Sequence, residues 1–261
     1  MKHASTPPVS VVTFASAGTP HPSTPCDHDE ATCSGHHSAG IAFGVGSRVQ
    51  YQPLQVVDLD VVSSGDHDDG GGIDDTSSPE SATWTAVWPT TESDIRYQTP
   101  QTAARGFATD YLHMVNPVIN QFQQGDARSG EVRVQPRITG PVTTVIVRQL
   151  GSDNSWWVLG AGTAAINLTE PAWNASITSP VTLTGTCIAF EGTVQTQVRA
   201  DNDNKPLAEG YVTGGSRAMG PFSGALAFAK ATTKYGAVVL YTTSAENGTV
   251  MEAMVIRVRF G

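Results

Sequence analysis

Short segments in which apolar and polar residues alternate follow one another through residues 175–261, and this pattern constrains the fold more than any other feature. A period of two places successive side chains on opposite faces of a β-strand. The expected strands cover residues 181–189, 194–198, 207–213, 222–229, 237–243 and 250–260. About seven strands with a turn every 8 to 12 residues are typical of an immunoglobulin-like β-sandwich.

Turn residues separate these segments. Asn247 and Gly248 form the dipeptide most typical of a tight hairpin, and residues 201–204 are Asn and Asp, which tolerate left-handed backbone conformations. The pair of cysteines that joins the two sheets of antibody domains is missing, because Cys187 has no partner in the later strands. We therefore expect Cys187 to behave as a small buried apolar residue.

Residues 82–170 are expected to form a small α+β domain. Thr99 and Pro100 are the residue types of a helix N-cap and a first-turn proline. Apolar residues at a spacing of four then define one face of a helix, namely Ala103, Phe107 and Tyr111. Strands are expected at residues 131–137, 142–150, 156–160 and 163–168. The prediction is a helix lying on an antiparallel meander, with Pro171 at the boundary to a sandwich domain of residues 171–261.

Residues 1–81 are predicted to be a disordered acidic tail rich in Pro, Gly, Ser and Thr, because such a segment buries too little apolar surface to offset its ordering entropy. Within it, residues 48–62 could be a short strand or a docking segment. The net charge of −9 argues against nucleic acid and anionic membranes as partners. No stretch has the roughly 18 apolar residues of a membrane helix, so membrane insertion is not expected.

The tail also contains the residues with the most metal-like chemistry. Cys26, His28, Cys33 and His36-His37 offer sulfur and imidazole ligands, but their spacing matches no standard zinc finger. Residues 66–75 are acidic without the alternating ligands of a calcium loop. Cys26 and Cys33 could form a disulfide in an oxidising compartment. We predict no metal site and no cofactor.

The folded part contains candidates for binding but none for catalysis. Glu191 follows apolar strand positions, and a carboxylate is rarely buried unless it is paired. It either forms a structural ion pair or grips a ligand, the available partners being Arg199, Arg217, Arg257 and Arg259. No second carboxylate has a defined relation to it, and no nucleophile elbow or phosphate-binding loop occurs. We therefore predict no catalytic residues.

Aromatic and apolar residues supply the other candidates. Trp156 and Trp157 are adjacent in an expected strand, so one indole should lie in the core and the other should be exposed or lie at the seam between the domains. An exposed aromatic side chain could bind carbohydrate or a protein. A glycine-rich turn at residues 214–220 is closed by Pro221. The candidate binding residues are Phe190, Glu191, Trp156, Trp157, Met219 and Phe222.

Several short motifs, taken together, resemble the immunoglobulin-like domain associated with bacterial spore germination. In the C-terminal part they are residues 179–181 (SPV), Gly185, 189–194 (AFEGTV), 214–215 (GG), 219–222 (MGPF), 244–248 (SAENG) and 255–258 (VIRV). Upstream, residues 130–132 (GEV), 140–145 (GPVTTV) and 155–161 (SWWVLGA) are similar to the region that precedes this domain in actinobacterial proteins. The resemblance covers roughly residues 82–261.

The resemblance implies a non-enzymatic, lipoprotein-like module of the cell envelope that binds a protein or a cell-wall glycan. A self-assembling scaffold module is the alternative, and a glycan-acting hydrolase that uses Glu191 is a third. Relatives begin with a signal peptide and a lipobox cysteine, which this sequence lacks. The expected location is extracytoplasmic if the true start lies upstream, and cytoplasmic if the chain as written is complete.

Overall fold

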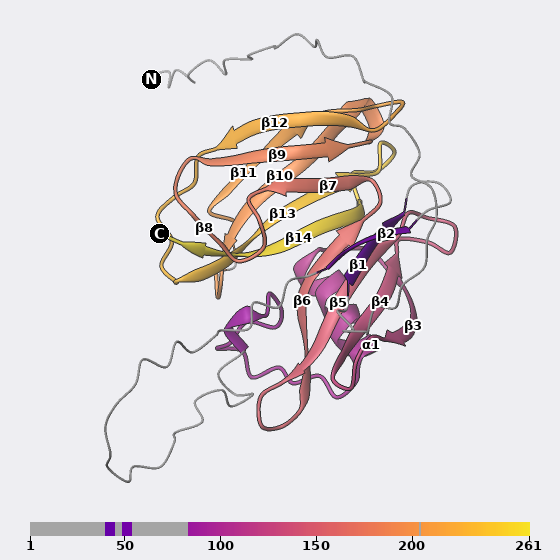
Figure 1. The fold of residues 1–261 in the computed structure, drawn as a ribbon, viewed down its shortest axis with the longest axis vertical. Coiled ribbons are helices and arrows are strands. Elements are labelled where there is room, and N and C mark those ends of the chain that lie inside the picture. Colours follow the sequence, from indigo (N-terminus) through magenta and orange to yellow (C-terminus); the bar gives the residue numbers. More distant parts are fainter. Residues whose placement is uncertain (1–39, 45–48, 54–82, 204) are drawn as a thin grey trace, which may run out of the picture. The chain divides into compact units, whose positions relative to one another are not determined.

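The structure, a computed structural model, describes residues 40–44, 49–53, 83–203 and 205–261 (Figure 1). The first two segments are the strands β1 (Gly40–Gly44) and β2 (Val49–Pro53), which pair antiparallel with Gly40 opposite Pro53. The short strand that was one of two alternatives for residues 48–62 is therefore present as β2. The other residues of the predicted tail lie outside the described part of the chain.

A long path of hydrogen-bonded strands organises the rest, in the order β11-β10-β13-β14-β6-β5-β4-β3. The strands are β3 (Val118–Gln124), β4 (Ser129–Gln135), β5 (Thr143–Leu150), β6 (Ser155–Thr163), β10 (Thr193–Ala200), β11 (Ala208–Thr213), β13 (Tyr235–Thr243) and β14 (Val250–Phe260). β4, β5 and β6 form three strands of the expected antiparallel meander, and β3 pairs with β4 at its edge. The fourth expected strand, residues 163–168, is β7 (Ile166–Glu170), which pairs mainly with β9 (Val181–Cys187). β6 joins β14 where Ala161 pairs with Val255. The boundary predicted near residue 171 stays a prediction, and strand pairing runs across it.

A second layer completes the sandwich in the C-terminal part (Figure 1). It consists of β7 (Ile166–Glu170), β9 (Val181–Cys187) and β12 (Gly220–Leu226), with β9 paired to both others. A short strand, β8 (Ala175–Ile177), runs parallel to β14. Inward-facing residues of both layers form one core, which includes Ile166, Leu183, Val194, Val238, Leu240 and Val258. The predicted mainly β fold with a C-terminal immunoglobulin-like sandwich is confirmed.

The opposite face of the long sheet is covered by the predicted helix. Thr99 caps α1 (Pro100–Gly106), because its side chain accepts a hydrogen bond from the Thr102 amide, as expected of an N-cap. A π-helical turn, Phe107–Tyr111, continues it. Phe107 is fully buried in a core that includes residues of β4, β5, β13 and β14. Among the described residues, no helix has the length and apolar character needed to cross a membrane.

β3 is the longest of the strands that the sequence pattern does not predict, the others being β1 and β8. β3 has the sequence VINQFQQ, in which polar residues outnumber apolar ones, and it forms the edge of the sheet. A shift in register between Ile119 and Phe122 interrupts its alternation. A strand that is polar and bulged carries little period-two signal, so sequence analysis read it as a connection.

Arg257 of β14 forms a buried ion pair with Asp201 and also donates a hydrogen bond to the start of the folded chain. Arg257 of β14 is fully buried, and its two terminal nitrogens donate to the two carboxylate oxygens of Asp201, each at 2.6 Å. Its Nε donates to the carbonyl of Trp84 at 2.8 Å. The Trp84 ring in turn stacks on Tyr235, 5.2 Å between centroids. These contacts satisfy a charge that would otherwise be costly to bury.

A second buried carboxylate, Glu252, makes the stability of the fold depend on pH. Glu252 of β14 is 8% exposed and accepts hydrogen bonds from the hydroxyls of Thr163 and Thr242. Burial raises the pKa of Glu252, while these hydrogen bonds lower it in part. The folded chain therefore holds this proton more tightly than the unfolded chain does. Stability is greatest below the ordinary pKa of the carboxyl group and falls as pH rises through the raised pKa.

The variant Glu252→Gln isolates this effect, because an amide keeps the shape but does not ionise. Urea unfolding of both proteins between about pH 4 and about pH 7 measures the difference in their free energies of unfolding. We expect the wild type to lose stability relative to Glu252→Gln as pH rises. If the free energies of unfolding of the two proteins differed by the same amount at every pH, the raised pKa of Glu252 would be contradicted.

Candidate functional site

The two stretches singled out in the sequence, residues 189–194 and 214–222, meet in space. The amide of Ala189 donates to the carbonyl of Gly215 at 3.0 Å, and the amide of Gly214 donates to the carbonyl of Gly192 at 2.8 Å. Ile188 forms a parallel bridge with Gly215. The β9–β10 turn and the β11–β12 loop thus form one hydrogen-bonded unit at the end of the sandwich.

Glycine is required where these segments touch. A Cβ on Gly215 would lie 1.9 Å from the carbonyl oxygen of Ala218 and 2.5 Å from the amide nitrogen of Gly220. Gly192 has a φ of +70°, and a Cβ there would lie 2.6 Å from the carbonyl oxygen of Gly214. Glycine at these positions permits the close approach of the backbones, and the hydrogen bonds between the two loops hold them together.

The loops present apolar side chains to solvent. Phe190 is 66% exposed and Met219 is 39% exposed, although both are large apolar residues. Glu191 lies between Phe190 and Gly192 with a φ of +54°, a left-handed conformation that a non-glycine residue adopts only when its surroundings impose it. We call the set Phe190, Glu191, Arg217 and Met219, all on these two loops and all exposed, the loop-end surface.

The predicted structural ion pair of Glu191 is wrong. Its side chain is exposed, and in the part of the chain that the structure describes the ion pairs are Arg257–Asp201 and Arg96–Asp153. The left-handed turn directs residue 191 out of the alternation that the strand pattern implied. Arg257 was one of the four arginines considered, but it pairs with an aspartate from the turn after β10.

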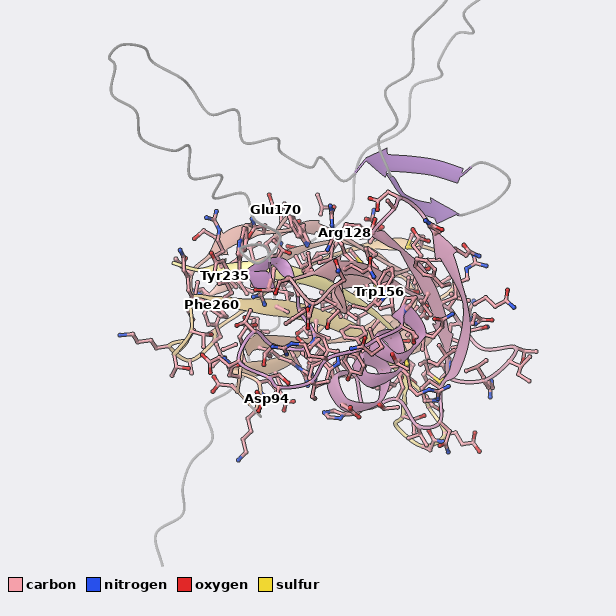
Figure 2. All side chains as sticks on the ribbon, turned by 90° about the horizontal axis from the view of Figure 1, so that it is seen from below. Asp94, Arg128, Trp156, Glu170, Tyr235 and Phe260 are labelled. Carbon is pink, nitrogen blue, oxygen red and sulfur yellow. The ribbon has the colours of Figure 1, made fainter. Side chains whose placement is uncertain are left out.

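Three of the six candidate residues do not lie on this surface. Phe222 is 4% exposed and belongs to the sandwich core, where its ring lies close to Gly185 of β9. Trp157 is buried against Ala86 and Leu150. Trp156 is half-buried and packs edge-on against Phe122, 5.2 Å between ring centroids. Figure 2 labels Trp156 and, in another part of the fold, Phe260, the residue that ends β14. The structure brings together Phe190, Glu191 and Met219 only.

Cys187 is buried directly beneath the loop-end surface, as predicted for a small apolar residue. Its sulfur lies so close to Gly214 that a Cβ on that glycine would be 2.5 Å away. Burial raises the pKa of the Cys187 thiol, although a backbone hydrogen bond with Gly215 lowers it in part. The thiol therefore stays protonated at neutral pH, the form that is not nucleophilic.

The described residues hold no obvious metal site. Among them, no three His, Cys, Asp or Glu side chains come together where an ion could bind. The cysteines and histidines of residues 26–37 and the acidic residues 66–75 lie outside the described part of the chain.

Sequence analysis also missed exposed groups that the structure reveals. Tyr211 of the edge strand β11 is 61% exposed, and Arg96 contacts Asp153 across a gap of more than fifty residues in sequence. Alternation within β11 could have assigned Tyr211 to the outer face, because Val212 beside it is buried. Nothing in the sequence indicates that Arg96 and Asp153 meet.

Comparisons with known proteins agree with this geometry at the level of the family. Neither the curated proteins nor the solved structures give a match. Residues 165–249 match the family model of the immunoglobulin-like domain of bacterial spore germination, and this range contains β7 to β13 and the whole loop-end surface. Domains of this immunoglobulin-like kind are generally non-catalytic. Residues 165–249 are therefore similar to the immunoglobulin-like domain of bacterial spore germination.

Proposed function

We propose that the chain is a non-enzymatic binding module of the cell envelope, and that the loop-end surface holds a protein partner. The observation that carries the proposal is the exposure of Phe190 and Met219 on two loops whose backbones are locked together. Aromatic residues and methionine are enriched at the centres of protein interfaces. A rigid loop loses little conformational entropy on binding, so more of the contact energy appears as affinity.

The charges of the surface favour a protein over a membrane or a nucleic acid. Glu191 and Arg217 are both exposed there and carry opposite charges, so the surface offers no strong field of one sign. Charged residues of both signs around exposed apolar side chains are typical of the rim and centre of a protein interface. The net charge of −9 also disfavours nucleic acid.

Hydrolysis by Glu191 has weaker support. Its side chain is exposed at the apex of a turn. A general acid that works at neutral pH needs burial or a charged neighbour to raise its pKa. No ion pair of Glu191 occurs in the described structure, so a binding role suits its exposed side chain better.

The double substitution Phe190→Ser with Met219→Ser tests the proposal. The whole chain is immobilised and exposed to solubilised envelope proteins from the organism that encodes it, and the bound partner is titrated against the wild type and the variant. We expect the variant to bind at least about tenfold more weakly, because removing two interface anchors typically costs more than about 1.4 kcal/mol.

A matched control removes equally exposed apolar side chains elsewhere. Val115 is 59% exposed and Ile138 is 81% exposed, and both lie in connections outside the loop-end surface. The control, Val115→Ser with Ile138→Ser, should bind as the wild type does. If the loop-end variant and the control variant lost the same amount of affinity for the partner, the proposal would be overturned. If the wild type is an oligomer that dissociates only in the loop-end variant, the surface serves self-assembly instead.

We also propose that the chain lies in the cell envelope, because of its resemblance to the spore germination family. The DNA upstream of the Met1 codon, read in frame, tests it. A basic start, an apolar run and a cysteine after small residues would support an anchored envelope protein. A stop codon directly upstream would contradict it and would redirect the search for partners to the cytosol.

A further inference from the structure

A concave site lies at the turn between β5 and β6, on residues other than those of the loop-end surface. Its volume is about 280 Å³. The segment that precedes α1 and the turn between β5 and β6 form its walls, and the lining residues include Thr91, Arg96, Gly151, Ser152, Asp153 and Trp157. Pockets for drug-sized ligands typically have about 300–1,000 Å³, so this cavity suits a single ring.

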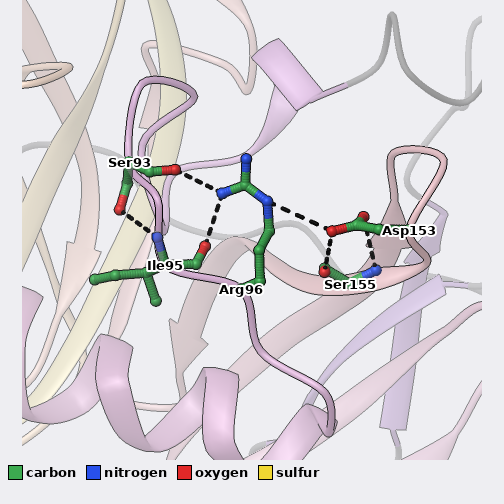
Figure 3. A network of polar contacts seen from close by, with 5 residues as sticks. All are labelled: Ser93, Ile95, Arg96, Asp153 and Ser155. Atoms are coloured by element: carbon green, nitrogen blue, oxygen red, sulfur yellow. Dashed lines mark hydrogen bonds and ion pairs between the residues drawn. The ribbon is translucent and has the colours of Figure 1, made fainter.

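Arg96 is held in place by the protein (Figure 3). Its Nη1 donates to the carbonyl oxygens of Ser93 at 2.5 Å and of Ile95 at 2.9 Å, and its Nε lies 3.5 Å from Oδ2 of Asp153. Figure 3 draws Nη2 without a contact to the other four residues shown. The planar guanidinium is thus held through Nη1 and Nε, an arrangement that binds a ligand with little loss of entropy.

Asp153 supplies the complementary acceptor. Its carboxylate accepts from the Ser155 hydroxyl at 2.6 Å and from the Ser155 amide at 3.2 Å, which fixes its orientation on the turn. The hydrogen bond from the Ser155 hydroxyl holds the pKa of Asp153 below its usual value, so the group is ionised. An acidic and a basic group side by side nearly cancel, so the cavity attracts neither anions nor cations strongly.

Trp157 forms the aromatic wall. Its ring is 2% exposed, and the Arg96 guanidinium lies over it, 5.4 Å from the ring centroid. Its Nε1 is buried and has no hydrogen-bond partner among the described residues. Because Nε1 is buried, a ligand in the cavity would not reach it, and its polar contacts would come from Arg96 and Asp153.

We propose that this cavity binds a single neutral sugar ring, with the Arg96 guanidinium donating to ring hydroxyls and the Asp153 carboxylate accepting from them. A hydroxyl group donates and accepts at once, so adjacent hydroxyls match a fixed donor beside a fixed acceptor. The hydroxyls of Thr91 and Ser152 extend the polar wall. The site is separate from the loop-end surface, and neither proposal depends on the other.

Other classes of ligand fit less well. A carboxylate or phosphate would gain contacts with Arg96 but would be repelled by Asp153, since the two charged groups lie 3.5 Å apart. An apolar ligand would leave the guanidinium and the carboxylate unsatisfied once water was displaced. A polyhydroxylated ring satisfies both groups and keeps the site neutral.

NMR titration of the isotope-labelled whole chain tests the proposal. The probes are D-glucose and N-acetyl-D-glucosamine, added to about 100 mM, above the Kd on the order of 1–10 mM that a ligand of this size would give. We expect saturable shifts of the amide signals of Gly151, Ser152 and Asp153 and of the Trp157 indole proton. Acetate and inorganic phosphate, added in the same way, should leave these signals unsaturated.

Two variants make the result decisive. Asp153→Asn keeps the hydrogen bond to the Ser155 amide but removes the charge, and it should weaken sugar binding at least tenfold. Asp126→Asn is the matched control, because Asp126 occupies the β3–β4 turn and accepts from the Arg128 amide in the same way, at 2.7 Å. It should bind as the wild type does. The proposal would be overturned if neither sugar gave saturable shifts, or if acetate or phosphate did. It would also be overturned if Asp153→Asn and Asp126→Asn lost the same amount of sugar affinity.

The same titration separates this inference from the proposed function. The loop-end variant, Phe190→Ser with Met219→Ser, should bind the sugars as the wild type does. A loss of sugar binding in that variant would show that the shifts do not report on the cavity, and it would overturn the assignment of the ligand to Arg96 and Asp153.

Discussion

Replacing Asp201 with Asn is expected to destabilise the folded chain by about 3–5 kcal/mol, the range measured when one partner of a buried ion pair is removed. Arg257 is fully buried, and both of its terminal nitrogens donate to the Asp201 carboxylate. An amide can accept only one of these hydrogen bonds, and its own NH₂ group would face a buried cation. The guanidinium would then lie in the interior without a counter-charge.

Chemical unfolding of the wild type and the variant measures this loss. Asp153→Asn is the control, because it makes the same substitution in the exposed pair with Arg96, where the side chains are 41% and 48% exposed. Exposed ion pairs contribute about 0–1 kcal/mol, so the control should shift the unfolding midpoint little. If Asp201→Asn were as mild as Asp153→Asn, the buried pair would contribute no more stability than the exposed one.

Replacing Gly215 with Ala is expected to destabilise the chain by about 3 kcal/mol, at the upper end of the range for overpacking a rigid interior. The added methyl group would overlap the carbonyl oxygen of Ala218, the amide of Gly220 and the carbonyl oxygen of Cys187. All three are backbone atoms, so the strain cannot be relieved by a change of rotamer. The β11–β12 loop would have to change its path and move away from the end of β9, and the loop-end surface would lose its shape.

Gly248→Ala separates this steric effect from backbone strain. Gly248 has a φ of +73°, but nothing lies within 4 Å of the position of its Cβ. The left-handed conformation alone costs about 1–2 kcal/mol for a residue with a side chain. Equal losses in Gly215→Ala and Gly248→Ala, measured by thermal and chemical unfolding, would contradict the view that the loops are locked by close contact.

Local signals in the sequence predicted most of the elements. The N-cap at Thr99, the alternation of β9 and β14 and the turn at Asn247-Gly248 each depend on residues close in sequence, and each is present. β3 was missed because its polar residues and its bulge hide the period of two. Propensity is a local property, so it describes elements better than it describes their partners.

The candidate site could be predicted only in part. The sequence indicated that residues 189–194 and 214–222 were unusual, but it did not show that they touch. It placed Phe222 and Trp157 among the binding residues, whereas both are buried. Which face of a strand points inward depends on the layer packed against it, and that layer comes from segments far away in the chain. For the same reason the partner of Arg257 could not be identified.

The core around the helix has a consequence for the order in which the chain can fold during its synthesis. Phe107 and Ala108 share their core with Val239 of β13 and Val255 of β14, which are made more than a hundred residues later. While the ribosome is still adding residues, the helix and β3 to β6 have an open apolar face. Such exposed surfaces favour binding by chaperones until long-range contacts form. The core around the helix therefore closes only after β14 has emerged.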